Sequence, residues 1–345
     1  MDLYLLLPGI LILAITIFDI IYTVLAPGGS GLVSGAISNG LWKIFYGLSR
    51  AVNKRQVLTG AGVTTVVAIV IGWVMLLWIG NFLILKSDQN SVINSSTGDV
   101  ANSKQVFYYT GYVLSTMGNG DYKGGSDNWQ IFSAVISFSG LIMITIAITY
   151  IVPVVAAVTD RRTLSIQISS IGHSVQSMLL TSWNGKDFKS LESDLHGISQ
   201  NIARQGQLHY AYPVLHFFHH QKKVAALLPN LAALDEALTI LYLYVQEEKR
   251  PSHEAVLPVR IALTTFLESL QSSFIKPAET APPLKIELLK EAGLPLLEPD
   301  QVAFQNLDLR RRMLKSMIAH DGWTWEEIDQ FPMNRKMDDY DKFTL

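Results

Sequence analysis

Three long apolar segments in the first 160 residues constrain the fold of this 345-residue chain more than any other feature. They cover residues 3–25, 58–85 and 129–158, and each reaches the roughly 20 residues that a helix needs to cross a bilayer core. Only helices and closed barrels can span that core, because every backbone polar group must find a partner inside the protein. The sequence therefore predicts an all-α membrane protein with three transmembrane helices.

The first apolar segment does not have the features of a cleaved signal peptide. Acidic Asp2 stands where such a peptide carries basic residues, and the apolar stretch exceeds the roughly 7–15 residues of a signal-peptide core. We therefore expect a retained membrane helix. Asp19 lies inside this helix, and a carboxylate facing lipid is costly. We expect it to face protein or to lie near an interface.

Residues 32–52 form a fourth segment with apolar positions at helical spacing. Together with Trp42 and Tyr46, this pattern predicts an amphipathic helix lying in the membrane interface, with the two aromatic rings at headgroup level. A short helix buried in the protein is the alternative interpretation.

Basic residues predict the orientation of the spans. Six of them flank the spans on one side, whereas the other side carries three lysines and no arginine. An excess of Lys and Arg marks cytoplasmic loops, so we expect a multi-pass protein of the cell membrane with its N-terminus outside. The six are Lys43, Arg50, Lys54, Arg55, Arg161 and Arg162, and the three are Lys86, Lys104 and Lys123.

A six-residue segment between the second and third spans has the sequence Thr116-Met117-Gly118-Asn119-Gly120-Asp121, here called the TxGxGD segment. Its two glycines give access to backbone conformations that are closed to bulkier residues, so that carbonyl groups can point towards a common axis. Residues 104–115, just before it, are predicted to form a short re-entrant helix, because such backbone is tolerated at membrane depth only where it is buried in protein or lines water. In this setting the segment resembles the pore of the tetrameric potassium channel family, of prokaryotic type.

The resemblance implies a selectivity filter of backbone carbonyls that bind potassium ions. By position, Thr116 lies at the inner end of the filter, Gly120 at its outer mouth, and Asp121 follows. Met117 stands where the family has Val or Ile. Asn119 stands where it has an aromatic ring that braces the filter, so Tyr108, Tyr109 or an asparagine hydrogen bond must supply the support.

The expected function is therefore a cation channel, with monovalent cations passing through a potassium-conducting pore. The chain carries one such segment, so the resemblance also implies a homotetramer surrounded by membrane lipids. Two alternatives stay open: a weakly selective sodium and potassium channel, because of Asn119, and a non-conducting membrane sensor or scaffold with a degenerate filter.

Two residues of the third span are candidates for gating. Gly140 lies where inner helices of this family carry a hinge glycine, although small residues in membrane helices also serve close packing. Pro153 predicts a kink near the cytoplasmic end of the span.

The rest of the chain is predicted to be an all-α cytoplasmic domain over residues 161–325, followed by a charged tail over residues 326–345. Its predicted helices cover residues 188–205, 214–223, 231–248, 254–274, 284–292 and 302–320. The pore domain covers residues 1–160. The chain has no cysteine, which excludes disulfides and thiolate chemistry, and no pattern of catalytic residues or bulk positive charge indicates an enzyme, a cofactor or nucleic-acid binding.

Four histidines gather between residues 209 and 220. His216 and His220 are four residues apart and could share a helix face and bind a metal ion with a third ligand. Proton sensing and plain packing in a domain interface are the other two interpretations, and packing is the favoured one.

Overall fold

The computed structural model describes residues 1–26, 28–52, 54–271, 276–298 and 301–329. These residues divide into two compact units. Unit 1 contains residues 1–52, 60–156 and 211–218, and unit 2 contains residues 54–59, 157–210 and the chain from His219 onward. Each unit therefore includes a short segment from the other half of the sequence.

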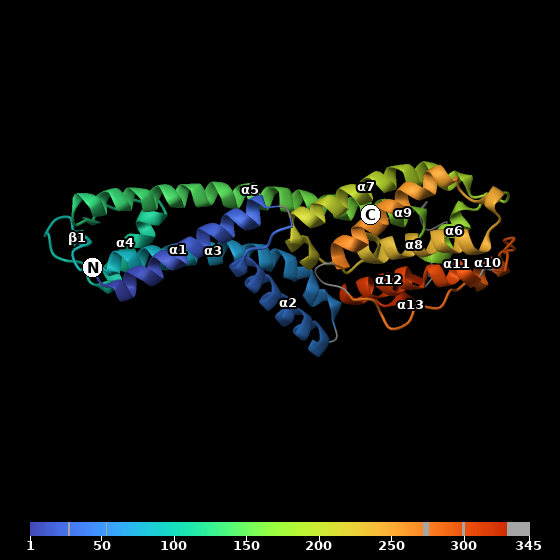
Figure 1. Ribbon diagram of the computed structural model, residues 1–345, viewed down its shortest axis with the longest axis horizontal. Helices are drawn as coiled ribbons and strands as arrows, with labels where there is room; N and C mark the ends of the chain where they lie inside the picture. The colour runs from blue at the N-terminus through green and yellow to red at the C-terminus, as the bar shows by residue number, and fades with distance from the viewer. Residues whose placement is uncertain (27, 53, 272–275, 299–300, 330–345) are drawn as a thin grey trace, which may run out of the picture. The chain divides into compact units, whose positions relative to one another are not determined.

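Unit 1 contains most of the predicted membrane helices, and the third of them continues beyond residue 156 into unit 2. The helices α1 (Leu3–Leu25), α3 (Ala61–Lys86) and α5 (Asp127–Ile171) are long and apolar enough to cross a membrane, and the 3-10 helix η1 (Arg55–Gly60) precedes α3. Helices α1 and α3 lie side by side (Figure 1), and a Cβ atom at Gly9 would come within 2.9 Å of the Gly80 carbonyl oxygen. Glycine thus lets the two backbones approach closely. The helical fold is thus confirmed, with three helices that are candidates for crossing the membrane.

The predicted amphipathic segment is helix α2 (Leu32–Val52), with the bounds expected from the sequence. Ser34 and Ser38 are its buried residues, so the helix is not enclosed in protein. The Trp42 ring packs at 5.8 Å from the Phe217 ring, in the 3-10 helix η3 (Pro213–Phe217). Trp42 is half-buried by these ring contacts, and its placement at headgroup level stays a prediction.

The loop between α3 and α5 contains helix α4 (Ser103–Leu114) and a small hairpin, β1 (Val92–Asn94) paired antiparallel with β2 (Tyr122–Gly124). A capping box starts α4: the Asn102 side chain accepts from the backbone of Gln105, and the Gln105 side chain accepts from the backbone of Asn102. This fixes the start of the helix within one residue of the prediction. The hairpin, which the sequence analysis did not predict, joins the chain before α4 to the chain after the TxGxGD segment.

Unit 2 is helical, and its centre is α8 (Leu227–Tyr244). Nearly all residues of α8 are buried, and it lies between α9 (His253–Gln271) and α12 (Asp308–His320) (Figure 1). The other α-helices are α6 (Val175–Ser182), α7 (Glu192–Ala211), α10 (Glu287–Glu291), α11 (Gln301–Asn306) and α13 (Trp325–Asp329). The short 3-10 helices are η2 (Lys189–Leu191), η4 (Lys223–Ala225) and η5 (Glu247–Lys249).

Two buried carboxylates of α8 bind arginines of the neighbouring helices. Asp235 accepts from Arg260 of α9 at 2.7 Å and from Arg310 of α12, and Glu236 accepts from Arg311 at 2.7 Å. Burial disfavours the charge on Asp235, but the two guanidinium groups outweigh it and hold the pKa of this carboxyl below its usual value. Removing one partner would leave an uncompensated buried charge, which typically costs about 3–5 kcal/mol.

Two predictions for this half of the chain need correction. The predicted helix over residues 214–223 does not form, because η3 ends at Phe217 and residues 218–222 are not helical. The expected tail over residues 326–345 starts too early, because α13 continues to Asp329 and buries Ile328. Residues 330–345 of that tail lie outside the described residues. In both places tertiary contacts decide the local structure, whereas the prediction used only local pattern and charge.

Candidate functional site

The TxGxGD segment follows α4 directly and has an unusual backbone. Thr116, Gly118 and Gly120 have φ angles of 61°, 60° and 81°, and Thr116 is the one non-glycine residue with a positive φ in the part of the chain that the structure describes. A β-branched residue in the left-handed region is strained, at a cost of about 1–3 kcal/mol. The structure thus brings all six predicted residues into one loop in which every second residue is left-handed.

Hydrogen bonds hold this loop at both ends. At the start, the Thr116 and Met117 amides donate to the carbonyls of Val113 at 3.0 Å and Tyr112 at 2.9 Å, which continues the last turn of α4. At the other end, the Ser95 amide donates to the Asp121 carbonyl at 2.9 Å, next to the β1–β2 hairpin. The strained middle of the loop is therefore fixed between a helix end and a hairpin.

The middle of the loop is open. Residues 115–121 are all exposed, and the Met117 side chain retains 65% of its accessible surface. A Cβ atom added at Gly118 or Gly120 would meet nothing within 4 Å. In the described part of the chain, the middle of this loop is therefore uncovered.

Aromatic side chains of α4 support the loop from behind. The Asn119 amide donates a hydrogen bond to the Tyr108 hydroxyl, and the Tyr108 ring packs edge-on against Tyr112, with ring centroids 5.1 Å apart. The Tyr112 hydroxyl donates to the Tyr122 carbonyl at 2.6 Å. Of the three braces that the sequence analysis considered, the structure contains the Asn119–Tyr108 pair. Tyr109 instead donates to Ser133 of α5 at 2.6 Å.

Gly140 of α5 lies against the end of α4. A Cβ atom at this position would come within 1.8 Å of the Leu114 carbonyl oxygen, so no larger residue fits without movement of a backbone. This contact explains the glycine by packing. Its second predicted role, as a hinge, stays a prediction, and α5 continues without a break through both Gly140 and Pro153.

The residues of α5 between these two positions have an exposed face. Ile144 and Ile148 retain 52% and 58% of their accessible surface, and Thr145 and Thr149 are exposed next to them. Both threonine hydroxyls donate back to α5 carbonyls, at 3.1 and 2.9 Å. Their hydrogen-bonding capacity is thus partly used within the helix, and the surface that α5 presents here is mostly apolar.

The two predicted metal ligands do not share a helix face. His216 belongs to η3, which ends at Phe217, whereas His220 follows in non-helical chain. Among the described residues no group of three or more His, Asp and Glu side chains could hold a metal ion. Burial and nearby arginines lower the pKa of His220, which favours its neutral form.

A buried carboxylate in α1 has a role that the sequence analysis did not identify. Asp19 is fully buried and accepts from the Val33 amide at 2.7 Å and from the Trp73 indole at 2.8 Å. It also accepts from the Ser34 hydroxyl at 2.5 Å. The carboxylate therefore caps the N-terminus of α2, where negative charge and hydrogen-bond acceptors are both favoured. The prediction that Asp19 faces protein is confirmed.

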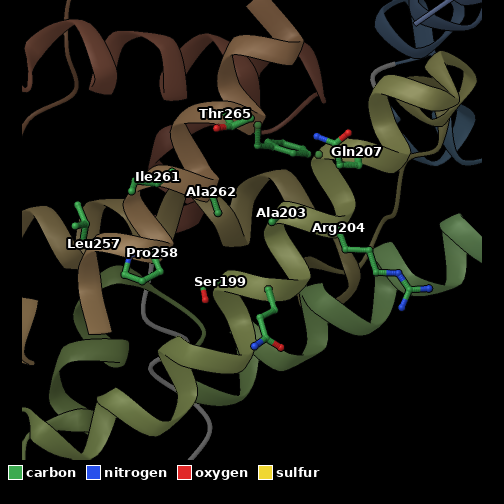
Figure 2. Close-up of a pocket in the computed structure, with 12 residues that line it drawn as sticks. Ser199, Ala203, Arg204, Gln207, Leu257, Pro258, Ile261, Ala262 and Thr265 are labelled. Carbon is green, nitrogen blue, oxygen red and sulfur yellow. The ribbon is translucent and has the colours of Figure 1, made fainter. Parts of the chain in front are cut away.

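A groove between α7 and α9 in unit 2 was also missed. It has a volume of about 630 Å³, and Figure 2 shows Ser199, Ala203 and Gln207 on its α7 wall and Leu257, Ile261 and Thr265 on its α9 wall. Its charged lining residue, Arg204, forms an ion pair with Asp160 at 2.7 Å. The sequence signal was the small residues of the two helices, which are too common in helices to single out a groove.

Comparison with known proteins places the chain among membrane proteins. Over 326 residues it is 30% identical to the "Uncharacterized membrane protein YdjJ" of Bacillus subtilis (strain 168), and the match covers 93% of this chain and 95% of that protein. The chain belongs to this family. The matched length includes both units of this chain. The chain matches no protein-family model, and no solved structure matches it.

Proposed function

We propose that the protein is one subunit of a homotetrameric cation channel, with the TxGxGD segment as its ion-conducting filter. The observation that carries this proposal is the left-handed backbone at Thr116, Gly118 and Gly120. An alternation of handedness turns successive carbonyl groups to one side of the chain, and a ring of such carbonyls can replace the hydration shell of a potassium ion.

The surroundings of the segment support the same function. The loop is open along its middle, as it must be if three further copies complete a ring around an axis. It is fixed at both ends and braced by Tyr108, so the exposed backbone is held in a strained conformation instead of relaxing. Strain that the surroundings maintain is typical of functional backbone.

In this proposal α4 is the pore helix, and the exposed apolar face of α5 lines the cavity below the filter. Gating takes place on α5, with Gly140 and Pro153 as the positions that absorb movement, under control of the helical second half of the chain. The N-terminus lies outside the cell and unit 2 lies in the cytoplasm, because the basic residues cluster on that side of the spans.

The test is ion flux into liposomes that contain the purified full-length protein. Separate potassium, rubidium and sodium gradients are applied. A potassium-selective channel passes potassium and rubidium ions much faster than sodium ions. Equal rates for potassium and sodium would support the weakly selective channel, and the absence of flux for every monovalent cation would support the non-conducting sensor.

Two glycine variants make the flux assay specific. Gly118→Ala places a side chain in a left-handed position of the proposed filter, and we expect it to abolish flux. Gly98→Ala introduces the same kind of backbone strain in the loop before α4, at φ 76° and likewise with no atom within 4 Å, and we expect it to retain flux. Equal flux in the two variants would contradict the assignment of the filter.

A further inference from the structure

Contacts at the N-terminus of α2 fix the rotation of this helix about its own axis. Asp19 binds the Val33 and Ser34 amides, and the Thr23 hydroxyl accepts from the Gly31 amide at 3.0 Å. A Cβ atom at Gly31 would come within 2.0 Å of the Asp19 carboxylate, so this close approach requires glycine. Further along the helix, a Cβ atom at Gly60 would lie 3.7 Å from the Phe45 ring. Which side chains of α2 face outward is therefore determined by the fold.

The outward surface of α2 has an apolar strip. Ile44, Leu48 and Val52 are spaced four residues apart and retain 57%, 50% and 53% of their accessible surface. Residues at this spacing lie on one side of a helix. The helix also connects α1 and α3, two helices that can each cross a membrane. A helix that connects two spanning helices starts and ends near the membrane surface, where an exposed apolar strip can enter the acyl region.

A second outward strip of α2 is positively charged. Lys43 and Arg50 are exposed and lie two turns apart, and the Arg50 guanidinium stacks over the Tyr46 ring at 5.0 Å. The chain has no Asp or Glu between Asp19 and Asp88. Within the described ranges no ion pair joins Lys43 or Arg50 to a carboxylate. The positive charge of this strip is thus available to an external anion.

We propose that α2 binds a bilayer surface that contains anionic phospholipids. Ile44, Leu48 and Val52 enter the acyl region, and Lys43 and Arg50 bind lipid phosphates at the headgroup level. The apolar strip alone would accept any lipid or a second protein surface. The unpaired basic strip beside it selects negatively charged headgroups, because each basic residue near an anionic surface strengthens binding about fivefold, which corresponds to about 1 kcal/mol.

The absence of cysteine from the chain permits a direct test. Leu48→Cys in the full-length protein is labelled with an environment-sensitive fluorophore, and the protein is placed in vesicles of zwitterionic phosphatidylcholine mixed with anionic phosphatidylglycerol. One lipid or the other carries brominated acyl chains, which quench a fluorophore that they contact. We expect the apparent affinity for the brominated anionic lipid to exceed that for the zwitterionic lipid by at least fivefold, and the preference to fall at high salt.

Charge variants identify the residues responsible. Lys43→Gln with Arg50→Gln should remove the preference, whereas Lys104→Gln with Lys123→Gln removes the same charge from the other loop and should preserve it. Glycerol phosphate in solution should not compete, since a free phosphate lacks the acyl chains. Equal quenching by the two lipids would overturn the proposal, and the absence of quenching by either would indicate that protein covers the strip. The assay uses no ion gradient, so its outcome is independent of the proposed channel function.

Discussion

Thr116 and Asn119 illustrate how single residues support an exposed and strained loop. Thr116 adopts a left-handed conformation that costs about 1–3 kcal/mol for a residue of its type. The amides of Thr116 and Met117 are bound to α4, and the Asn119 side chain is bound to Tyr108. The middle of the loop therefore depends on one side-chain hydrogen bond, from Asn119 to Tyr108.

This dependence predicts the effect of Tyr108→Phe. The variant keeps the ring that packs on Tyr112 but loses the acceptor of the Asn119 hydrogen bond, so the loop should become more mobile and less selective. We expect the permeability ratio of potassium to sodium, measured from bi-ionic reversal potentials, to fall severalfold. Tyr210→Phe, at an exposed tyrosine of unit 2, is the control. An unchanged ratio would show that Asn119 is supported in another way.

Buried histidine predicts how stability depends on pH. Burial, aided by the charge of Arg161, lowers the pKa of His209 to about 3. The unfolded chain binds a proton near pH 6.5 that the folded chain does not bind, so the stability present above pH 6.5 is lost as the pH falls below it. The loss from this residue approaches about 1.4 kcal/mol per pH unit.

The matching measurement is the melting temperature of the purified protein between pH 7.5 and 5.5. His209→Phe removes the titrating group and should reduce the loss, although His220 and His320, whose pKa values are also lowered by burial, still contribute. His253→Gln, at an exposed histidine, should leave the loss unchanged. If the melting temperatures of both variants fall with pH as much as that of the unsubstituted protein, His209 does not titrate as described.

At the scale of elements, the packing of α5 on α4 predicts a large effect of one methyl group. Gly140→Ala places a Cβ atom within 1.8 Å of the Leu114 carbonyl oxygen, so the two helices must separate. Overpacking of this kind typically costs about 1–3 kcal/mol, and we expect a clear fall in melting temperature. Gly47→Ala in α2 meets nothing within 4 Å and should be neutral or stabilising by about 0.5–1 kcal/mol. A stable Gly140→Ala variant would contradict the packing explanation.

Elements with a strong local signal were predictable from the sequence. The apolar runs fixed the bounds of α1 and α2, and the capping residues at Asn102 and Gln105 mark the start of α4. The chain around His216 carried helical periodicity as well, yet it is not an α-helix. There the fold is decided by partners that are distant in sequence, such as Asp321, which binds His219 in the buried interior of unit 2.

The same limit applies to the candidate site. The six residues of the TxGxGD segment were recognisable because glycine and threonine occur in a short fixed pattern. The sequence did not show that Tyr108, and not Tyr109, supports the loop. Both tyrosines lie on α4, and only the rotation of the helix decides which hydroxyl faces Asn119. The capping of α2 by Asp19 was missed because the two partners are separated by a loop of unknown geometry.

At the scale of the whole molecule, each unit is completed by residues from the other half of the chain. Arg55, just before α3, donates two hydrogen bonds to Glu327, at 2.8 and 2.9 Å, and one to the Gly322 carbonyl at 2.9 Å. Its guanidinium also stacks on the Trp323 ring at 3.7 Å. A planar, forked side chain makes these contacts together, which lysine cannot do.

Arg55→Lys therefore tests how much this contact contributes. We expect a fall in stability of about 1–3 kcal/mol, measured as a lower melting temperature, and faster proteolysis of the chain near α13. Arg204→Lys changes a single, more exposed ion pair with Asp160 and should cost less than about 1 kcal/mol. Equal behaviour of the two variants would mean that Arg55 acts as a simple surface charge.

The pairing of Arg55 with Glu327 also implies a minimum delay during biosynthesis. The two residues are 272 positions apart, and at the usual rate of about 5–20 residues per second a ribosome needs roughly 14–54 seconds to pass from one to the other. During that interval the segment that leads into α3 has been made, but the residues that bind it have not. The nascent protein therefore carries α1, α2 and α3 for most of this interval before unit 2 can close around residue 55.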